Sequence, residues 1–266
     1  MKILVCVKQV PDTTEIRIDP VTNTLIRAGV PSILNPFDGF ALEVAARIKD
    51  QNPGTVITVI SMGPEQAKEA LRSCLAAGAD KAYLITDRAF SGSDTLATSY
   101  ILSRAIKAVE KETGPFDIIF CGKQAIDGDT AQVGPEIAEH LGYPQVTYAA
   151  EVSVEEGVAK VKRETEDGYE ILAVQTPAVI TVTKTPFELR YPSLRCKMAS
   201  IRAIIPSLTS ADLDIDLNRV GLKGSPTKVK KTFTPQVKKR GVRIKEDTGA
   251  DSARKLAALL NEAKLI

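Results

Sequence analysis

The sequence is poor in the side chains that most enzymes use for acid–base and metal chemistry. It contains one histidine, His140, and no tryptophan. Its four cysteines, Cys6, Cys74, Cys121 and Cys196, are far apart and form no C-x-x-C pair. Such a set argues against a zinc site, a disulfide framework and a histidine-dependent hydrolase. We expect no metal ligands and no catalytic side chains. We expect His140 to be a partly exposed helix residue without a functional role, and Cys6, Cys74 and Cys121 to have packing roles.

Long apolar runs are also absent. No stretch of about 18 consecutive apolar residues occurs, so we expect no membrane span. The apolar stretch at residues 1–7 is short for a signal peptide and no small-residue cleavage site follows it, which favours a cytoplasmic protein. The 266 residues, 44% of them hydrophobic, are enough for one large domain with a substantial core.

Neither sign of charge dominates, but the charge is unevenly distributed. The 35 Lys and Arg and 33 Asp and Glu give a net charge of +2. Residues 219–245 contain ten cations and no acidic residue, so the remaining chain has a net charge of −8. Charge alone suggests an arm for nucleic acid or an anionic membrane. Because glycines and prolines interrupt the segment and Phe233 is its one aromatic residue, we expect an arm that wraps an acidic protein partner and no nucleic-acid binding.

Strand-like and helix-like segments alternate over the first half of the sequence. We expect strands at residues 3–7, 55–61, 81–86 and 116–121. We expect helices that begin at Asn35-Pro36, at Gly63-Pro64 and at Asp94, and a fourth helix that ends near Gly142. Asn35 is expected to cap the first helix, with Asp38 near its positive end. This alternation predicts an α/β fold with a doubly wound, mainly parallel sheet.

The second half of the sequence follows a different pattern. Residues 146–154, 158–164 and 169–174 predict an antiparallel extension, and residues 178–183 predict one more buried strand. A short hairpin is expected at residues 15–27. After residue 188 we expect no regular element before a terminal helix at about residues 250–265, because the apolar periodicity is lost.

Two segments lie where ligands bind doubly wound sheets, at the carboxyl ends of strands. One is Cys6-Val7-Lys8, and the other is the glycine-containing loop at residues 122–135. The loop matches neither standard phosphate-binding fingerprint. Asp129 and Gln132 fit a capping box, Gly134-Pro135 offers another helix start, and in either case the nearby N–H groups can hold a phosphate. An ordinary capped turn is an equal alternative, and Asp127 with Asp129 makes only a weak Mg²⁺ site.

Several short motifs occur in an order typical of one family. They are V-C-V-K-Q-V at 5–10, N-P-F-D at 35–38, Gly63-Pro64, A-G-A-D at 77–80, G-K-Q-A-I-D at 122–127, Pro144-Gln145, L-R-Y at 189–191 and the leucine of Y-P-S-L at 191–194. With these motifs the sequence resembles the β subunit of electron transfer flavoproteins. The resemblance runs from the first strand to the final helix.

The resemblance implies a subunit that pairs with a larger α subunit to carry flavin. It places an adenine nucleotide against Cys6, Asn35, Pro36, Phe37, Asp38, Met62, Gly122, Lys123, Gln124, Ala125, Ile126, Asp127, Gly128, Asp129, Thr130, Ala131, Gln132 and Val133. In conventional members this nucleotide is AMP with a structural role. In bifurcating members it is the ADP half of a second FAD, which takes a hydride from NADH. Residues 127–135 and 189–195 are similar to the bifurcating type, so we expect FAD, with NAD(H) as electron donor.

The resemblance also implies partners. Electrons would pass to a low-potential carrier, ferredoxin or flavodoxin, and through the α-subunit FAD to a flavin-dependent dehydrogenase of the acyl-CoA or lactate type. Tyr191, Leu194 and Arg195 match the docking segment for that dehydrogenase, with Leu194 as its anchor. We therefore expect an adenine-nucleotide-binding α/β domain at residues 1–187. Residues 188–266 would hold the partner-recognition loop, the basic arm and a helix that docks on the α subunit.

Two other functions remain open from the sequence. One is a conventional electron carrier in which this chain binds AMP. The other is a non-redox regulatory module that binds an adenine nucleotide.

Overall fold

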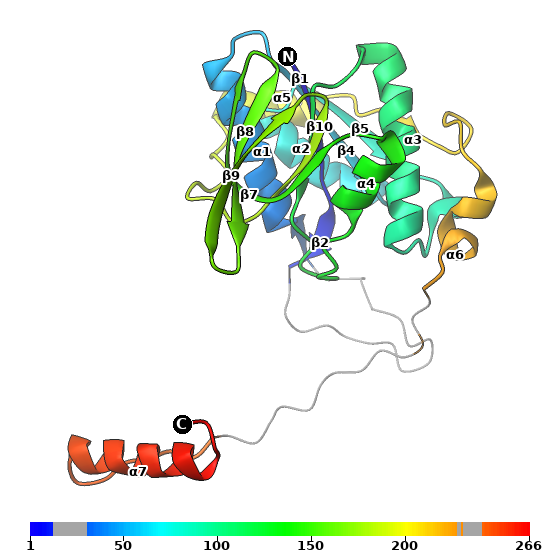
Figure 1. Ribbon diagram of the computed structural model, residues 1–266. Coiled ribbons are helices and arrows are strands. Elements are labelled where there is room, and N and C mark those ends of the chain that lie inside the picture. The colour runs from blue at the N-terminus through cyan, green and yellow to red at the C-terminus, as the bar shows by residue number, and fades with distance from the viewer. Residues whose placement is uncertain (13–30, 228–229, 231–240) are drawn as a thin grey trace. The chain divides into compact units, whose positions relative to one another are not determined.

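A nine-stranded sheet forms the core of the α/β unit (Figure 1). The computed structural model describes residues 1–12, 31–227, 230 and 241–266. The strand order is β11-β5-β4-β1-β6-β10-β7-β8-β9, and β2 and β3 pair in a separate antiparallel sheet. The strands are β1 (Lys2–Cys6), β2 (Gln9–Pro11), β3 (Ser32–Leu34), β4 (Val56–Met62), β5 (Lys81–Ile85), β6 (Ile118–Gly122), β7 (Gln145–Glu155), β8 (Val158–Thr165), β9 (Gly168–Gln175), β10 (Ala178–Val182) and β11 (Ser207–Leu208).

Five of the described helices lie between strands in the chain: α1 (Pro36–Gln51), α2 (Lys68–Ala76), α3 (Thr95–Thr113), α4 (Val133–Leu141) and α5 (Leu194–Arg202). Two more, α6 (Gly221–Gly224) and α7 (Gly249–Glu262), follow the last strand. Their ends follow local sequence signals. Asp94 caps α3 by accepting from the Ala97 N–H at 3.1 Å, and Gly142 ends α4 in the left-handed conformation.

The sheet is doubly wound. From β1 the chain adds β4 and then β5 on one side, and it returns to place β6 and β10 on the other. In the order given above, every neighbouring pair from β11 through to β7 is parallel. The last two pairs, β7 with β8 and β8 with β9, are antiparallel. The expected mainly parallel sheet with an antiparallel extension is therefore confirmed. The hairpin expected at residues 15–27 lies outside the described residues.

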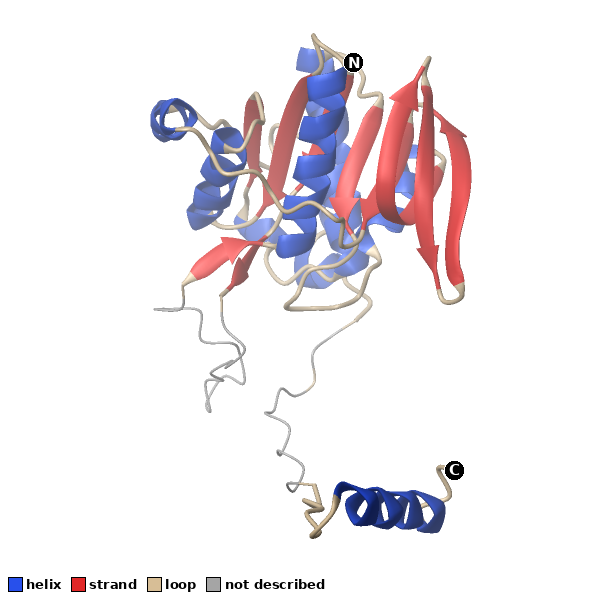
Figure 2. Ribbon diagram, turned by 90° about the vertical axis from the view of Figure 1, so that its left-hand side faces the viewer, coloured by secondary structure: helices blue, strands red, loops and turns tan. Residues whose placement is uncertain are grey.

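Helices cover both faces of the parallel part of the sheet (Figure 2). Ile3 and Val5 of β1 pack with residues of α1 and α2 in one core cluster, whereas Leu4 and Cys6 pack with residues of α3 and α4 in another. Alternate side chains of a strand point to opposite faces, so a strand covered on both sides reads as an unbroken apolar run. Cys74 is fully buried in the first cluster, as expected for a packing residue.

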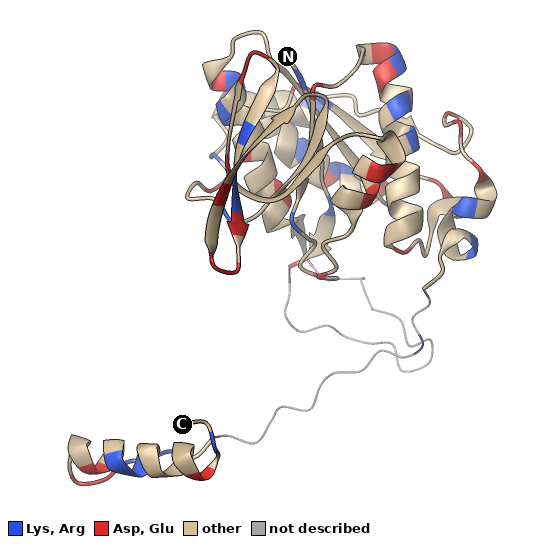
Figure 3. Ribbon diagram, viewed as in Figure 1, with Lys and Arg blue, Asp and Glu red and all other residues tan. Residues whose placement is uncertain are grey.

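The antiparallel extension carries charge on its exposed surface. Figure 3 shows acidic and basic residues interspersed on β7, β8 and β9. Lys162 pairs with Glu151 at 2.8 Å and Arg163 pairs with Glu170 at 3.4 Å across neighbouring strands. Such cross-strand pairs favour the observed register and make the outer strands soluble without a helical cover.

The prediction of no regular element after residue 188 is wrong, because α5 occupies Leu194–Arg202. Ser193 caps this helix by accepting from the Cys196 N–H at 3.1 Å. At its other end the Arg72 guanidinium donates to the carbonyl oxygens of Ser200, Ile201 and Ala203. The helix therefore depends on a cap and on a cation from α2, neither of which gives the long buried apolar stripe that identifies a helix in a sequence.

The chain forms two compact units. Residues 1–230 form one compact unit and residues 231–266 form a second. Residues 205–220 pack on the first unit, with Ile205, Leu213 and Val220 buried and β11 paired with β5. In the second unit, Thr248 caps α7 by accepting from the Asp251 N–H at 3.2 Å. Among the described helices, none has the length and apolar character needed to cross a membrane.

Candidate functional site

The strand order reverses between β1 and β6, which is where a doubly wound sheet binds its ligand. The two strands are in register, with Cys6 opposite Cys121, so their carboxyl ends lie side by side. Lys8 follows β1, and the loop that begins at Gly122 follows β6. The two sequence segments proposed for ligand binding therefore meet at one edge of the sheet.

The start of α1 joins both of these strand ends. The Asp38 carboxylate accepts from the Lys8 N–H at 2.7 Å and from the Gly122 N–H at 3.2 Å. The Asn35 N–H donates to the Lys8 carbonyl at 2.9 Å. Asn35 and Asp38 are both buried. The N-P-F-D segment is thus part of the site rather than only the beginning of a helix.

Asn35 does not cap α1 in the expected way. It occupies the N-cap position, but its side chain accepts no hydrogen bond from the first turn of the helix. Instead, its Nδ2 donates to the Gln124 carbonyl at 2.9 Å, and its Oδ1 accepts from the Ile126 N–H at 3.2 Å. The side chain turns to the loop because that loop presents both a donor and an acceptor within its reach.

The Asp38 carboxyl is electrostatically unusual. Burial raises its pKa to about 7, while the Asn35 side chain, the N–H donors of Lys8 and Gly122 and the Lys8 charge act in the opposite direction. Asp38 was expected to lie near the positive end of the helix dipole, and it does lie in the first turn of α1. Its contacts, however, are with the two strand ends.

Ion pairing and hydrogen bonding occupy both carboxylates of the loop. Lys8 Nζ donates to Asp127 Oδ1 at 2.6 Å, and Gln124 Nε2 donates to Asp129 Oδ1 at 2.7 Å. The Lys8 cation offsets the charge of Asp127 and so reduces its repulsion of an anionic ligand, whereas the neutral Gln124 amide fixes the position of the Asp129 carboxylate without offsetting its charge. Within the described residues, no group of three or more His, Cys, Asp or Glu side chains could hold a metal ion.

The capping box expected at Asp129 and Gln132 does not form. Helix α4 begins at Val133, close to the alternative start at Gly134-Pro135, and Gln132 occupies the N-cap position without a side-chain cap. Asp129 and Ala131 instead adopt positive φ values of 52° and 55°. In the described part of the chain, no protein group accepts from the N–H groups of residues 130–133. These N–H groups precede a helix, the arrangement that binds phosphate in many proteins.

Glycines shape the loop at three positions. At Gly122 a Cβ atom would lie 2.3 Å from Asp38 Oδ1, and at Gly134 it would lie 2.4 Å from the methyl group of Thr181. These two glycines let the loop and α4 approach the sheet closely. At Gly128 a Cβ atom would meet no other residue within 4 Å. The loop is therefore held tightly at both ends and is open at the exposed Gly128.

The structure brings most of the expected nucleotide-binding residues together. Cys6, residues 35–38 and residues 122–129 are connected by the contacts above, and residues 130–133 continue the same loop. Met62 ends β4, the strand beside β1, and lies at the same edge of the sheet. Two further residues also belong here: Lys8, which pairs with Asp127, and Thr181, which packs on Gly134. The sequence placed Lys8 in the segment after the first strand, whereas nothing in the sequence connects Thr181 with Gly134.

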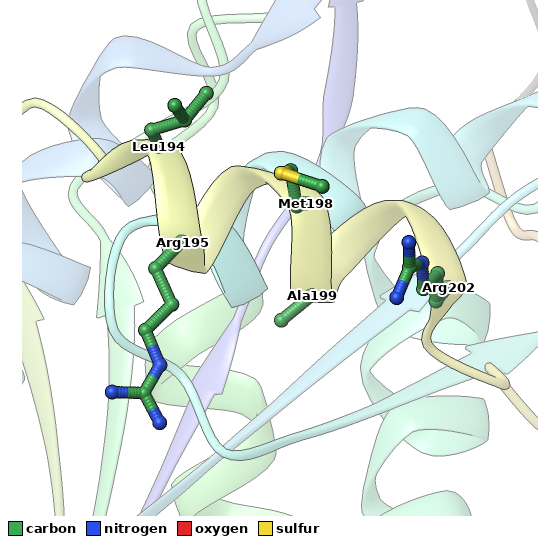
Figure 4. A pocket seen from close by; sticks show the side chains of 5 residues that line it. All are labelled: Leu194, Arg195, Met198, Ala199 and Arg202. Carbon is green, nitrogen blue, oxygen red and sulfur yellow. The ribbon is translucent and has the colours of Figure 1, made fainter.

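The expected partner-binding residues lie elsewhere, on or beside α5. Tyr191 is 96% exposed and Leu194 is 76% exposed, so both are free to meet another protein. Leu194, Arg195, Met198, Ala199 and Arg202 line a shallow hollow along the helix (Figure 4). Met198 follows Leu194 by one helical turn and is also exposed, so the apolar surface is larger than the single leucine predicted from the sequence. The prediction that Leu194 lies in an irregular stretch is wrong, since it begins α5.

The remaining reactive side chains have structural surroundings. His140 is half-buried against the Tyr100 ring, with ring centroids 5.7 Å apart, and burial lowers its pKa. Cys6 and Cys121 are buried free thiols. A hydrogen bond with Cys121, together with burial, raises the pKa of the Cys6 thiol. Burial therefore favours the neutral forms of His140 and Cys6.

Comparison with known proteins agrees with this geometry. The family model described as "Electron transfer flavoprotein domain" matches residues 22–213. The chain is 53% identical over 255 residues to the electron transfer flavoprotein subunit beta of Megasphaera elsdenii, covering 95% of this chain and 94% of that protein. It is 48% identical over 266 residues to the caffeyl-CoA reductase-Etf complex subunit CarD of Acetobacterium woodii, covering all of both chains. It is also 45% identical to the protein FixA of Bradyrhizobium diazoefficiens, covering 98% of this chain and 92% of that protein.

The family model spans most of the α/β unit, and the similarity to the M. elsdenii subunit extends over nearly the whole chain. The chain therefore belongs to the electron transfer flavoprotein family, as a β subunit, and its role is electron transfer in association with an α subunit.

Proposed function

We propose that this chain is the β subunit of a bifurcating electron transfer flavoprotein and that its loop site holds the ADP half of an FAD. When bound, a flavin supplies hydride acceptance from NADH and one-electron transfer. One electron would leave for ferredoxin or flavodoxin, and the other would leave through the α-subunit FAD for a dehydrogenase of the acyl-CoA or lactate type. The protein's own contribution is to bind and orient the nucleotide.

The N–H groups of residues 130–133 are the observation that carries this proposal. In the described part of the chain they have no protein acceptor, and they lie between a strand end and the start of α4. A diphosphate offers several anionic oxygens to such a row of donors. The space around Gly128 leaves room for the second phosphate and for whatever group extends from it.

The other residues of the site have roles that follow from their positions. Cys6 and the backbone of residues 35–38 would enclose the adenine and the ribose at the sheet edge, with Met62 on the neighbouring strand. Lys8 offsets the charge of Asp127 and so limits its repulsion of the phosphates, and Gln124 fixes the position of the Asp129 carboxylate. No acid–base role is assigned to any side chain, because binding and orientation are sufficient for a redox cofactor.

Similarity to CarD supports the choice of FAD over AMP. CarD is a subunit of a caffeyl-CoA reductase-Etf complex, and its sequence aligns with this chain from end to end. A complex of an Etf with a reductase is the kind of assembly proposed here. The exposed α5 surface offers a site for such an enzyme, with Tyr191, Leu194 and Arg195 as contacts.

The cofactor content of the purified heterodimer tests the proposal. This chain should be produced together with its α subunit, and the nucleotides should be released and quantified. Two FAD per heterodimer, with NADH able to reduce bound flavin, are expected. One FAD with one AMP would identify a conventional carrier, and the absence of flavin would favour a non-redox nucleotide-binding module.

A further inference from the structure

The side chain of Asn35 is used by the protein itself. Its exposed fraction is 1%, and its amide group makes two hydrogen bonds to the backbone of the loop. Nδ2 donates to the Gln124 carbonyl at 2.9 Å, and Oδ1 accepts from the Ile126 N–H at 3.2 Å. The Asn35 amide thus bonds one backbone carbonyl and one backbone N–H of the loop, as the backbone of a paired strand does, and so fixes the first half of the loop.

Asp38 holds the same loop at its beginning. One carboxylate oxygen accepts from the Gly122 N–H and the other accepts from the Lys8 N–H. The carboxylate thus joins two strand ends that are far apart in the sequence. Gly122 is required for this contact, since a Cβ atom there would overlap Asp38 Oδ1.

We propose that Asn35 and Asp38 are positioning residues, which fix the loop at residues 122–127 so that the N–H groups of residues 130–133 face the nucleotide. The inference rests on the nucleotide site proposed above. It differs from a direct binding role because the polar atoms of both side chains are engaged with the backbone. Backbone atoms of residues 35–38 remain available to the nucleotide.

The loop itself gives an independent reason for such a support. Asp129 and Ala131 have positive φ values, a conformation that costs energy for residues other than glycine. The Asp129 side chain is held by Gln124, whose carbonyl is held by Asn35. Removing the Asn35 amide therefore releases the residue that supports the strained part of the loop.

Amide hydrogen exchange tests the proposal in the heterodimer, both as purified and after removal of the nucleotide. Asn35→Ala is expected to speed exchange of the N–H groups of residues 122–128 by about tenfold in the nucleotide-free protein, because a net hydrogen bond limits local opening by about that factor. The dissociation constants for FAD and for AMP should rise by a similar factor. The matched control is Asn52→Ala at the other end of α1, which removes one hydrogen bond to the Ile48 carbonyl and should change neither quantity.

The two measurements separate a positioning role from a direct one. Weaker binding with unchanged exchange in the nucleotide-free protein would mean that Asn35 contacts the nucleotide, and the proposal would be wrong. No change in either quantity would also overturn it. If the Ala variant does not fold, Asn35→Asp keeps an acceptor for Ile126 but places an oxygen against the Gln124 carbonyl, and the same faster exchange is expected. Should the unaltered heterodimer bind no adenine nucleotide, the proposed function fails, but the exchange comparison still decides the positioning role.

Discussion

Asp38 shows how one buried side chain connects the fold with the site. Its carboxylate makes no ion pair shorter than 4 Å among the described residues, and it is stabilised by backbone N–H groups of two strands. Burial raises its pKa to about 7, above the value of about 3.9 expected in an unfolded chain. A carboxyl with a raised pKa makes the folded state depend on pH.

The sign of that dependence follows from the two pKa values. Below pH 4 Asp38 is protonated in both states, and between pH 4 and 7 it ionises only in the unfolded chain. Its contribution to the free energy of unfolding is therefore lost as pH rises toward 7, by an amount on the order of a few kcal/mol. Asp38→Asn should flatten this part of the profile, which can be measured by urea unfolding of the heterodimer at pH 5 and pH 8. Parallel profiles for the two proteins would contradict the prediction.

Gly122 and Gly128 form a matched pair for a second residue-scale prediction. Gly122→Ala places a Cβ atom 2.8 Å from the backbone nitrogen of Asp38, so something in the tightly packed corner must move. We expect a loss of roughly 1–3 kcal/mol in the free energy of unfolding, together with loss of nucleotide. Gly128→Ala meets no neighbour within 4 Å, so its unfolding free energy should stay within about 0.5 kcal/mol of the original. Equal losses for the two variants would show that the packing at Gly122 does not decide the effect.

At the scale of elements, the sequence predicted the parts of the sheet that are buried on both faces. Residues 3–7 are apolar without a break because β1 is covered by helices on two sides. The α5 helix could not be found in this way, since Leu194, Met198 and Ile201 are exposed and Ser200 is the residue it buries. Its position depends on Arg72, which is distant in the sequence. Likewise, the capping role expected for Asn35 failed because the loop competes for its side chain.

The exposed apolar side of α5 gives an element-scale prediction. If this helix meets the dehydrogenase, Leu194→Ala should lower the rate of electron transfer to that enzyme by about tenfold at low dehydrogenase concentration, because an anchor residue at an interface contributes 1 kcal/mol or more. Flavin content should not change, since Leu194 contacts no part of the nucleotide site. Ile204→Ala is the control, because Ile204 is 93% exposed and lies just beyond the end of α5. Transfer rates that are equal for Leu194→Ala and the unaltered protein would remove Leu194 from the interface.

At the scale of the whole molecule, the sequence predicts where the candidate nucleotide site lies but not how the basic segment divides between two compact units. The edge formed by Cys6 and Gly122 follows from strand order, and strand order follows from the alternation of elements. The basic segment at residues 219–245 spans the boundary between the two compact units. Arg219 and Lys223 belong to the first compact unit, where the Arg219 guanidinium lies 3.9 Å from the centroid of the Tyr100 ring. Charge counting alone cannot separate cations that pack on the α/β unit from those that remain for a partner.

The cations beyond residue 230 give the last prediction. If this segment binds an acidic α subunit, replacing Lys238, Lys239 and Arg240 by Gln should weaken the heterodimer about tenfold at physiological salt, and less at high salt because exposed charges are screened. The control replaces Lys81, Lys111 and Lys160, which are exposed on the α/β unit, and removes the same charge. Association can be measured by titrating the α subunit, and retention on heparin and binding to random duplex DNA can be measured with the same proteins.

The intact heterodimer should bind DNA weakly at physiological salt, since the α subunit would already neutralise these cations. Tight, salt-sensitive DNA binding that the arm substitutions abolish would instead make the arm a nucleic-acid-binding segment.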